Sequence, residues 1–304
     1  METVESKVQP ASTTIRLAWA IMLLASLLPE ILQREFLGDD GTWLIWTRVA
    51  ILIVLFVLSF FCAPIRPLRA FIALWLVMFA AFQVSDRINF TLPFLQNLLG
   101  GSAFVRKMQP EQFGKLAVSL LVILALILFG YRRKQLYLTL GKLDAPITPV
   151  KWMGFPKPDP WWKFGGQYGF YIALGMGLVA WLVSRPGPEM FSRIIPMLPG
   201  ILLFAAMNAF NEEMTYRASM LATLETPVGY KNAWWLSALY FGIAHFYGVP
   251  YGWLGIALAT FNGWLLGKAM LETRGLFWAW FIHFWQDVWI FSFLAIGSII
   301  PGGG

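Results

Sequence analysis

Six residues that can take part in acid–base chemistry lie within apolar segments of the chain. They are Glu212, Glu213 and Arg217 in one segment, His245 in a second, and His283 and Asp287 in a third. Amide hydrolysis needs an activated nucleophile, a proton shuttle and stabilisation of the developing oxyanion, and these residue types can supply all three. Two imidazoles and a carboxylate can also hold a divalent metal ion. The residues alone therefore allow both a metal-free and a metal-dependent hydrolysis.

The composition says what surrounds these groups. Of the 304 residues, 58% are hydrophobic and only 13% are charged, whereas soluble domains carry roughly 25% charge. The sequence therefore predicts an all-α polytopic membrane protein. The net charge of +7 is expected from loops near anionic lipid rather than from nucleic-acid binding. Cys62 is the single cysteine, so a disulfide within the chain is excluded.

Apolar runs close to the ~20 residues needed to cross the hydrocarbon core predict about eight to nine transmembrane helices. Nine runs qualify, at residues 15–33, 43–63, 68–85, 114–131, 164–184, 194–222, 233–249, 252–271 and 275–297. Basic residues and five prolines mark the stretch between the fourth and fifth runs. We therefore expect a variable set of N-terminal helices (1–135), a cytoplasmic linker (136–163) and a catalytic membrane domain (164–304).

The polar residues of the back half are expected to meet inside the membrane. An ionisable side chain at the bilayer centre costs about 2.5–3.5 kcal/mol on insertion scales, so six such groups would not be scattered over lipid-facing surfaces. Residues four apart share one face of a helix. Three pairs have this spacing: Glu213 with Arg217, Phe241 with His245, and His283 with Asp287.

These three motifs, in this order and each in its own apolar segment, resemble the signature of the CPBP family. Its members are the CAAX-protease and bacteriocin-processing intramembrane proteases, also called ABI proteins. The resemblance covers roughly residues 165–297. It implies an intramembrane endopeptidase that cleaves a membrane-anchored protein or peptide, in a prokaryotic cell membrane. The front half of the chain resembles nothing that we can specify.

The resemblance also implies roles for four catalytic residues. Glu212 is similar to the glutamate that activates water, and His245 to the histidine that holds or deprotonates that water. His283 corresponds to a second essential histidine, which helps to hold the water or the oxyanion. Asp287 departs from the pattern, because this position is often Asn and an ionised Asp cannot donate a hydrogen bond. Asp287 must then be protonated, orient His283 or bind a metal.

Four further residues are expected to support the site. Glu213 and Arg217 resemble an ion pair that fixes the helix, and Phe241 is expected to pack against the catalytic groups. Asn262 is expected to bridge helices, and it could also line the site. The oligomeric state is not indicated by the sequence.

Two alternatives stay open beside the favoured glutamate mechanism, which requires no cofactor. In the first, the same protease is zinc-dependent, with Glu212, His245 and His283 as the metal ligands. In the second, a transporter uses the buried Glu, His and Asp residues as a proton or cation relay. A transporter would be expected to show repeat symmetry between its halves. The sequence contains no evident internal repeat, which favours the protease.

The distribution of basic residues predicts the orientation. With nine spans, fourteen of the 23 Lys and Arg residues lie on the side of the N-terminus, eight lie on the other side, and Arg217 lies within a span. The positive-inside rule makes the first side cytoplasmic. We therefore expect the N-terminus in the cytoplasm and the C-terminus outside.

Overall fold

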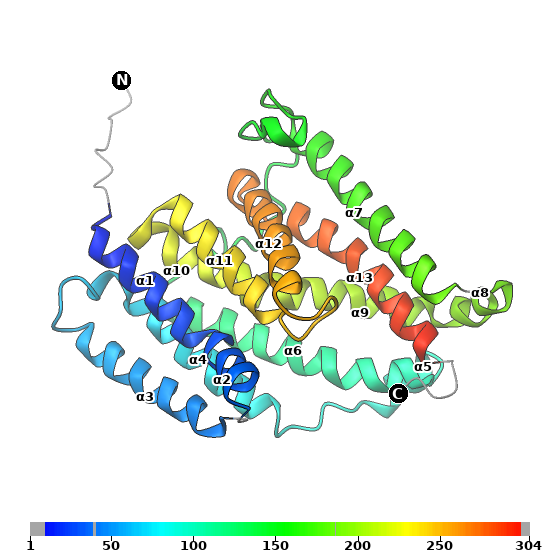
Figure 1. Ribbon diagram of the computed structural model, residues 1–304, viewed down its shortest axis with the longest axis horizontal. Coiled ribbons are helices and arrows are strands. Elements are labelled where there is room, and N and C mark those ends of the chain that lie inside the picture. Colours follow the sequence, from blue (N-terminus) through cyan, green and yellow to red (C-terminus); the bar gives the residue numbers. More distant parts are fainter. Residues whose placement is uncertain (1–9, 39–40, 186, 299–304) are drawn as a thin grey trace.

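The computed structural model describes residues 10–38, 41–185 and 187–298, and its regular elements within those ranges are helices (Figure 1). The all-α class is therefore confirmed. The front half contains α1 (Ser12–Ala25), α2 (Leu28–Leu37), α3 (Thr42–Leu58), the short η1 (Arg66–Leu68), α4 (Arg69–Ser85), α5 (Pro93–Leu98) and α6 (Ala103–Leu128).

The back half follows a segment that holds a short 3-10 turn, η2 (Lys151–Met153). It contains α7 (Trp161–Ser184), α8 (Pro188–Ile194), η3 (Ile195–Met197), α9 (Leu198–Glu212), the π-helix η4 (Glu213–Ala218), α10 (Ser219–Val228), α11 (Tyr230–Ala244), α12 (Trp253–Thr273) and α13 (Phe277–Gly297). Gly229, with φ +79°, separates α10 from α11, and this positive φ favours glycine.

Five helices of the described residues are long and apolar enough to cross a membrane, and the bent pair α1–α2 would make six. The predicted count of eight to nine spans is therefore not confirmed. Two of the expected spans are short in the structure: the apolar part of α3 is Trp43–Leu58, and α11 has 15 residues. A helix of 15 residues is about 22 Å long, which is less than the ~30 Å hydrocarbon core.

The fourth predicted span, 114–131, has the wrong start. Helix α6 begins at Ala103 and continues through Pro110 to Leu128. Ser102 caps the start of the helix by accepting a hydrogen bond from the Val105 amide at 3.2 Å. The helix is therefore 26 residues long, and residues expected near its end lie in its middle.

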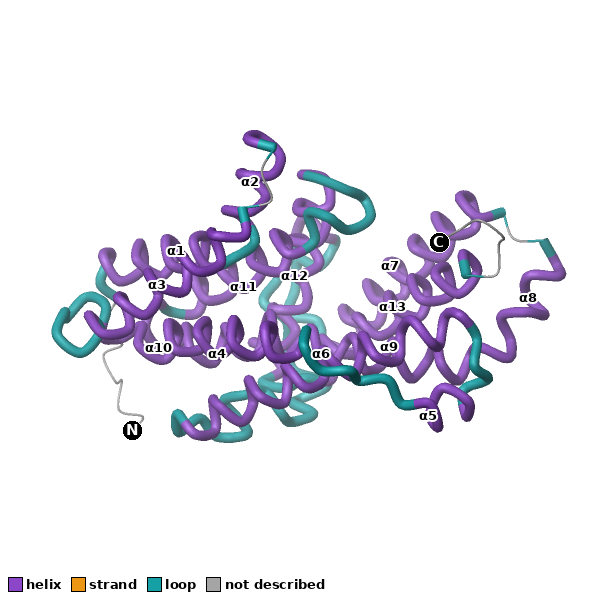
Figure 2. The backbone as a smooth tube through the Cα atoms, turned by 90° about the horizontal axis from the view of Figure 1, so that it is seen from below, coloured by secondary structure: helices purple, strands orange, loops and turns teal. Residues whose placement is uncertain are grey.

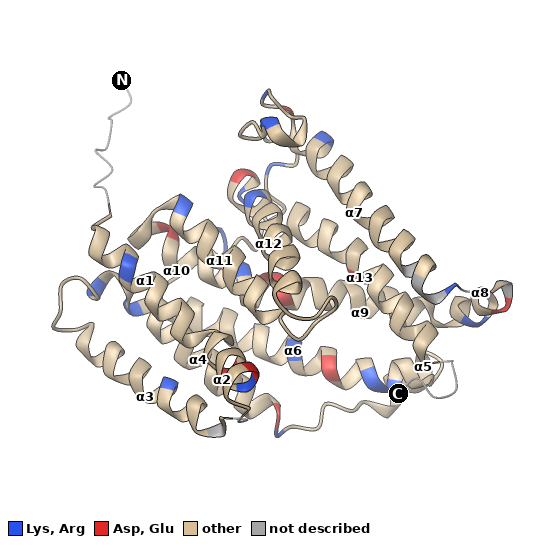
Figure 3. Cartoon of the chain, viewed as in Figure 1, with Lys and Arg blue, Asp and Glu red and all other residues tan. Residues whose placement is uncertain are grey.

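The helices form two groups that meet near the middle of the molecule. In Figure 2, α1, α3, α4, α10 and α11 lie on one side, and α7, α9 and α13 lie on the other. The continuous run from α9 through η4 to α10 passes from one group to the other, and α6 packs along it. Charged residues are sparse along these helices (Figure 3). The junction of the two groups is where the polar residues of η4 lie.

The predicted linker segment packs against the ends of α12 and α13. The Leu276 amide donates to the Thr139 carbonyl at 2.8 Å. A Cβ on Gly275 would lie 2.3 Å from the Gly141 nitrogen, so glycine is required for this close approach. The Tyr137 hydroxyl donates to Glu225 at 2.9 Å. Burial, and then the Glu225 carboxylate, raise the pKa of Tyr137, so that the phenol stays a donor.

A buried carboxylate on α12 anchors the same segment a second time. Glu272 accepts hydrogen bonds from the Thr148 amide at 3.0 Å and from the Trp161 indole at 2.9 Å. Lys268 donates to Glu272 at 2.5 Å and to the Thr148 carbonyl at 2.9 Å. Because Lys268 and Glu272 are both nearly inaccessible, these bonds hold the segment between α6 and α7 firmly against α12.

Candidate active site

The two adjacent glutamates lie where the long central helix changes its geometry. Glu212 is the last residue of α9, and Glu213 begins the π-helix, which ends at Ala218. Single π-helical turns within α-helices are frequent at functional sites. The expected ion pair of Glu213 and Arg217 is present, and both side chains are fully buried. Both carboxylates lie near His283, but at different ring nitrogens, and Glu213 also pairs with Arg217.

The Glu212 carboxylate faces both histidines of the chain. Its Oε2 lies 3.6 Å from His283 Nε2 and 4.0 Å from His245 Nε2. His283 comes from the middle of α13, and His245 is the residue that ends α11. The structure thus brings together three residues that were expected to meet, from three different helices.

Each imidazole is held through its other nitrogen. His283 Nδ1 lies 2.8 Å from Glu213 Oε1, and His245 Nδ1 lies 2.7 Å from the Phe241 carbonyl oxygen. Both partners are acceptors, so Nδ1 donates in both rings. A neutral imidazole then carries its lone pair on Nε2, the atom that faces Glu212. Both rings are therefore set to accept a proton on the side of Glu212.

Asp287 lies one turn beyond His283 on α13. Its Oδ2 is 3.7 Å from His283 Nε2 and accepts a hydrogen bond from Asn208 Nδ2 at 3.0 Å. Asn208 belongs to α9, one turn before Glu212. The oxygen that Asp287 presents to this cluster is therefore an acceptor.

Sequence reasoning missed Lys115, which comes from the front half of the chain. Its Nζ donates to Asn208 Oδ1 at 2.9 Å and lies 3.4 Å from Glu212 Oε1. The charge count for orientation had placed Lys115 on the side opposite the N-terminus, at the start of the fourth predicted span, and the site had been expected to use back-half helices alone. Because α6 starts at Ala103, Lys115 is residue 13 of its 26 residues. A lysine at that depth carries the same desolvation cost as the glutamates, and this cost was the signal that could have identified it.

Of the expected supporting residues, Phe241 and Arg217 lie beside this cluster. The Phe241 ring is 4.3 Å from the His245 ring and 5.9 Å from the His283 ring, centroid to centroid. The guanidinium of Arg217 lies 4.8 Å from the centre of the Phe241 ring, within the range of a cation–π contact. Asn262 exchanges two hydrogen bonds with Gln286, at 2.9 and 3.0 Å. It therefore ties α12 to α13.

A close helix–helix contact sets the position of His245. A Cβ on Gly242 would lie 1.9 Å from Thr260 Oγ1 and 2.7 Å from the Ile256 carbonyl oxygen. Both of these atoms belong to α12. Glycine at this position lets α11 approach α12 closely three residues before His245.

The members of the cluster differ in their exposure. The side chains of Glu213, His283 and Asp287 are 0, 5 and 3% exposed, and that of Glu212 is 13% exposed. His245 and Lys115, at 36 and 35%, are the accessible members. The exposed part of the cluster is therefore formed by side chains from the end of α11 and the middle of α6.

Within the described residues, no group of three His, Cys, Asp or Glu side chains has an arrangement that could hold a metal ion. The donor set that sequence reasoning proposed for zinc was Glu212, His245 and His283. The ammonium of Lys115 already lies 3.4 Å from Glu212 Oε1. A second cation on this carboxylate would be repelled by the first, so the residues present fit zinc poorly.

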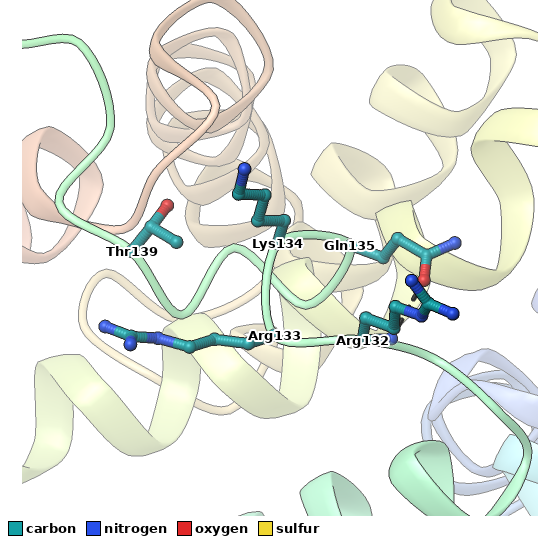
Figure 4. A pocket seen from close by; sticks show the side chains of 5 residues that line it. All are labelled: Arg132, Arg133, Lys134, Gln135 and Thr139. Carbon is teal, nitrogen blue, oxygen red and sulfur yellow. Dashed lines mark hydrogen bonds between the residues drawn. The ribbon is translucent and has the colours of Figure 1, made fainter.

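A surface hollow elsewhere in the protein has a different character. It is lined by Arg132, Arg133, Lys134, Gln135 and Thr139, in the segment after α6 (Figure 4). Its lining contains three cationic side chains and neither a carboxylate nor a histidine. This hollow therefore lacks the groups needed to activate water, and the cluster around Glu212 is the candidate active site.

Comparison with known proteins supports this assignment. Residues 194–289 match the family model described as type II CAAX prenyl endopeptidase Rce1-like. No curated protein and no solved structure was found to match the chain. The matched residues run from the end of α8 into α13 and include Glu212, His245, His283 and Asp287. Residues 194–289 are therefore similar to the Rce1-like CAAX protease family, in agreement with the resemblance of the three motifs.

Proposed function

We propose that the protein is an intramembrane endopeptidase in which Glu212 activates water for the hydrolysis of a peptide bond in a membrane-associated protein or peptide. One observation carries the proposal: Glu212 Oε2 faces the Nε2 atoms of both histidines, whose Nδ1 atoms are engaged by other acceptors. A carboxylate and two oriented imidazoles are the components that water activation requires.

The geometry suits one water molecule held by several groups. Glu212 Oε2 is separated from the two Nε2 atoms by 3.6 and 4.0 Å. Each of these pairs can lie within about 2.8 Å of a single water oxygen. The carboxylate takes a proton from the water as its oxygen attacks the carbonyl carbon. That proton passes from the Glu212 carboxyl group to Nε2 of an imidazole and from this imidazolium to the leaving amine, so both groups return to their starting states at the end of the cycle.

Glu213 acts through His283 in this scheme. By accepting the Nδ1 proton of His283, it fixes the ring and favours the tautomer with a free Nε2. It also stabilises the imidazolium that forms when Nε2 takes a proton. The fully buried Arg217 balances the charge of Glu213, which lowers the cost of keeping a second carboxylate at this depth.

Comparative membrane proteomics of wild type and Glu212→Gln tests the function. The substitution keeps the shape of the side chain and removes its charge, so we expect cleavage products in wild-type membranes to disappear in the variant. Glu189→Gln, the same change on the exposed α8, is the matched control and should leave the products unchanged. Products that persist in Glu212→Gln at equal protein levels would reject the role of Glu212. Absence of cleavage in wild type as well would favour the proton or cation relay.

A further inference from the structure

We propose that Lys115 is a catalytic residue of this reaction, whose ammonium group stabilises the oxyanion formed on the substrate carbonyl. The inference rests on the proposed hydrolysis and adds a residue outside the 194–289 segment that matches the protease family. It concerns a side chain that comes from α6 and meets Glu212 across 97 positions of the sequence.

The partners of Glu212 differ sharply between its two oxygens. Oε2 faces the Nε2 atoms of His245 and His283, which accept protons when the rings are neutral. Oε1 faces Lys115, whose ammonium has three donors and no acceptor. Of these three partners, Lys115 is therefore the one that brings a permanent positive charge to the reacting atoms.

The neighbouring amide and carboxylate are committed to each other. Because Lys115 can only donate, Asn208 must present its oxygen to Lys115 and its NH₂ group to Asp287. Asp287 Oδ2 is consequently an acceptor, and the amide of Asn208 is occupied. Asn208 thus connects Lys115 to Asp287, and the cation lies on the side of Glu212.

The position of Lys115 suits an oxyanion. The attacking oxygen and the carbonyl oxygen become bonded to the same carbon, so negative charge develops close to the carboxylate that activated the water. Lys115 Nζ lies 3.4 Å from Glu212 Oε1 and 3.4 Å from Glu111 Oε1, and both contacts are longer than a good charge-assisted hydrogen bond. An oxyanion can replace either of them. The side chain is also 35% exposed, so a substrate can reach it.

Two hydrogen bonds fix α6 against α9 so that Lys115 lies beside Glu212. Asn211 Nδ2 donates to the Gln112 carbonyl at 3.1 Å, and the Ser119 hydroxyl lies 3.1 Å from the Asn211 carbonyl oxygen. Lys115 lies between these two contacts on α6. Its backbone is therefore fixed against α9 one turn before and one turn after the side chain that reaches the site.

The test compares Lys115 variants on a fluorogenic peptide that carries the sequence cut in wild-type membranes. Loss of one oxyanion donor costs about 10²–10³-fold in kcat in other enzymes. We expect a loss of that size in Lys115→Met and Lys115→Gln, with unchanged thermal midpoints and little change in KM. Lys115→Arg keeps the positive charge, so its kcat should be within about tenfold of wild type, which corresponds to about 1.4 kcal/mol of barrier. Lys107→Met, the same change two turns earlier on an exposed part of α6, should retain full activity.

A phosphinic analogue of the peptide, which mimics the tetrahedral anion, separates this role from simple substrate binding. Lys115→Met should weaken binding of the analogue by about the factor lost in kcat/KM, while peptide binding measured in the Glu212→Gln background stays unchanged. Asp287→Asn, which introduces an amide donor beside the site, should return at least tenfold activity to Lys115→Met. Wild-type kcat in Lys115→Met, or a loss confined to KM for peptides with a free C-terminal carboxylate, would overturn the proposal. Neither result would affect the role of Glu212, which its own variant tests.

Discussion

Glu213 Oε1 lies 2.8 Å from His283 Nδ1, so the second glutamate of the pair positions the histidine that faces the first. The same carboxylate also pairs with Arg217. Two residues that are adjacent in the sequence thus act on opposite ends of one imidazole. Their substitutions should therefore have different consequences.

Glu213→Gln should reduce activity by about 10–100-fold and lower the thermal midpoint, whereas Glu212→Gln should abolish activity without a thermal effect. The glutamine carbonyl can still accept the Nδ1 proton of His283, but it leaves the buried Arg217 uncompensated. Thermal denaturation in detergent and kcat on the fluorogenic peptide measure the two effects. The double variant Glu213→Gln/Arg217→Met should regain thermal stability. Equal and complete loss of activity in both single variants, with equal thermal midpoints, would contradict this division.

Asp287→Asn should keep activity within about tenfold of wild type, about 1.4 kcal/mol of barrier, and Asp287→Ala should be far more damaging. The asparagine carbonyl can accept the hydrogen bond that Asn208 donates to Asp287 at 3.0 Å, whereas alanine leaves that buried amide unpaired. Initial rates of the purified variants decide between these outcomes. An Asn variant that is as inactive as the Ala variant would show that the charge of Asp287 is required.

Chelators should leave the activity unchanged. Lys115 occupies the neighbourhood of Glu212 Oε1, and the proposed mechanism uses a water held by Glu212 and two imidazoles. Rates after prolonged treatment with 1,10-phenanthroline or EDTA, followed by passage over a desalting column, provide the measurement. If activity is lost on treatment and regained when zinc is added, the glutamate mechanism is wrong and the enzyme is metal-dependent.

Gly242→Ala should lower both the thermal midpoint and kcat. A Cβ at this position would meet Thr260 Oγ1 at 1.9 Å and the Ile256 carbonyl oxygen at 2.7 Å, so α11 must move away from α12 and carry His245 with it. Gly175→Ala on α7 is the matched control, because a Cβ there meets no atom within 4 Å. Wild-type kcat in a folded Gly242→Ala variant would show that the position of His245 tolerates this movement.

The orientation can be tested with reporters fused to the chain. The excess of basic residues on the side of the N-terminus predicts that a reporter after residue 150 is cytoplasmic and that one after residue 304 is external. Alkaline phosphatase and green fluorescent protein fusions give opposite readings on the two sides. If both fusions report the same side, the number of spans between these positions differs from the predicted number by one.

The sequence predicted the back-half cluster well because burial penalties act on residue types. Exposing the side chain of Glu212, His245 or His283 to lipid would cost too much free energy, and the helices that carry them are strongly apolar. These side chains were therefore expected to contact one another inside the protein. The pairing of Glu213 with Arg217 followed from helical spacing. The π-helix was not predicted, because a turn with i→i+5 bonding leaves no periodic pattern in a short segment.

The participation of Lys115 was missed for a different reason. The predicted span starts at residue 114, and this boundary places Lys115 at the end of a helix, whereas α6 begins at Ala103 and continues through Pro110. Proline within a helix removes one hydrogen bond and does not always end the helix. The close contact of α6 with α9 depends on individual hydrogen bonds of Gln112 and Ser119, which hydrophobic patterning does not encode.

The contact between Lys115 and Glu212 means that the candidate active site is formed by both halves of the chain. A fragment that ends before α7 would carry the lysine, and the remaining fragment would carry the glutamates and both histidines. The segment between α6 and α7 is bonded to α12 and α13, so it would guide the two pieces back into register. The protein is therefore suited to fragment complementation, in which recovered proteolysis reports that two separately expressed halves have reassembled in one membrane.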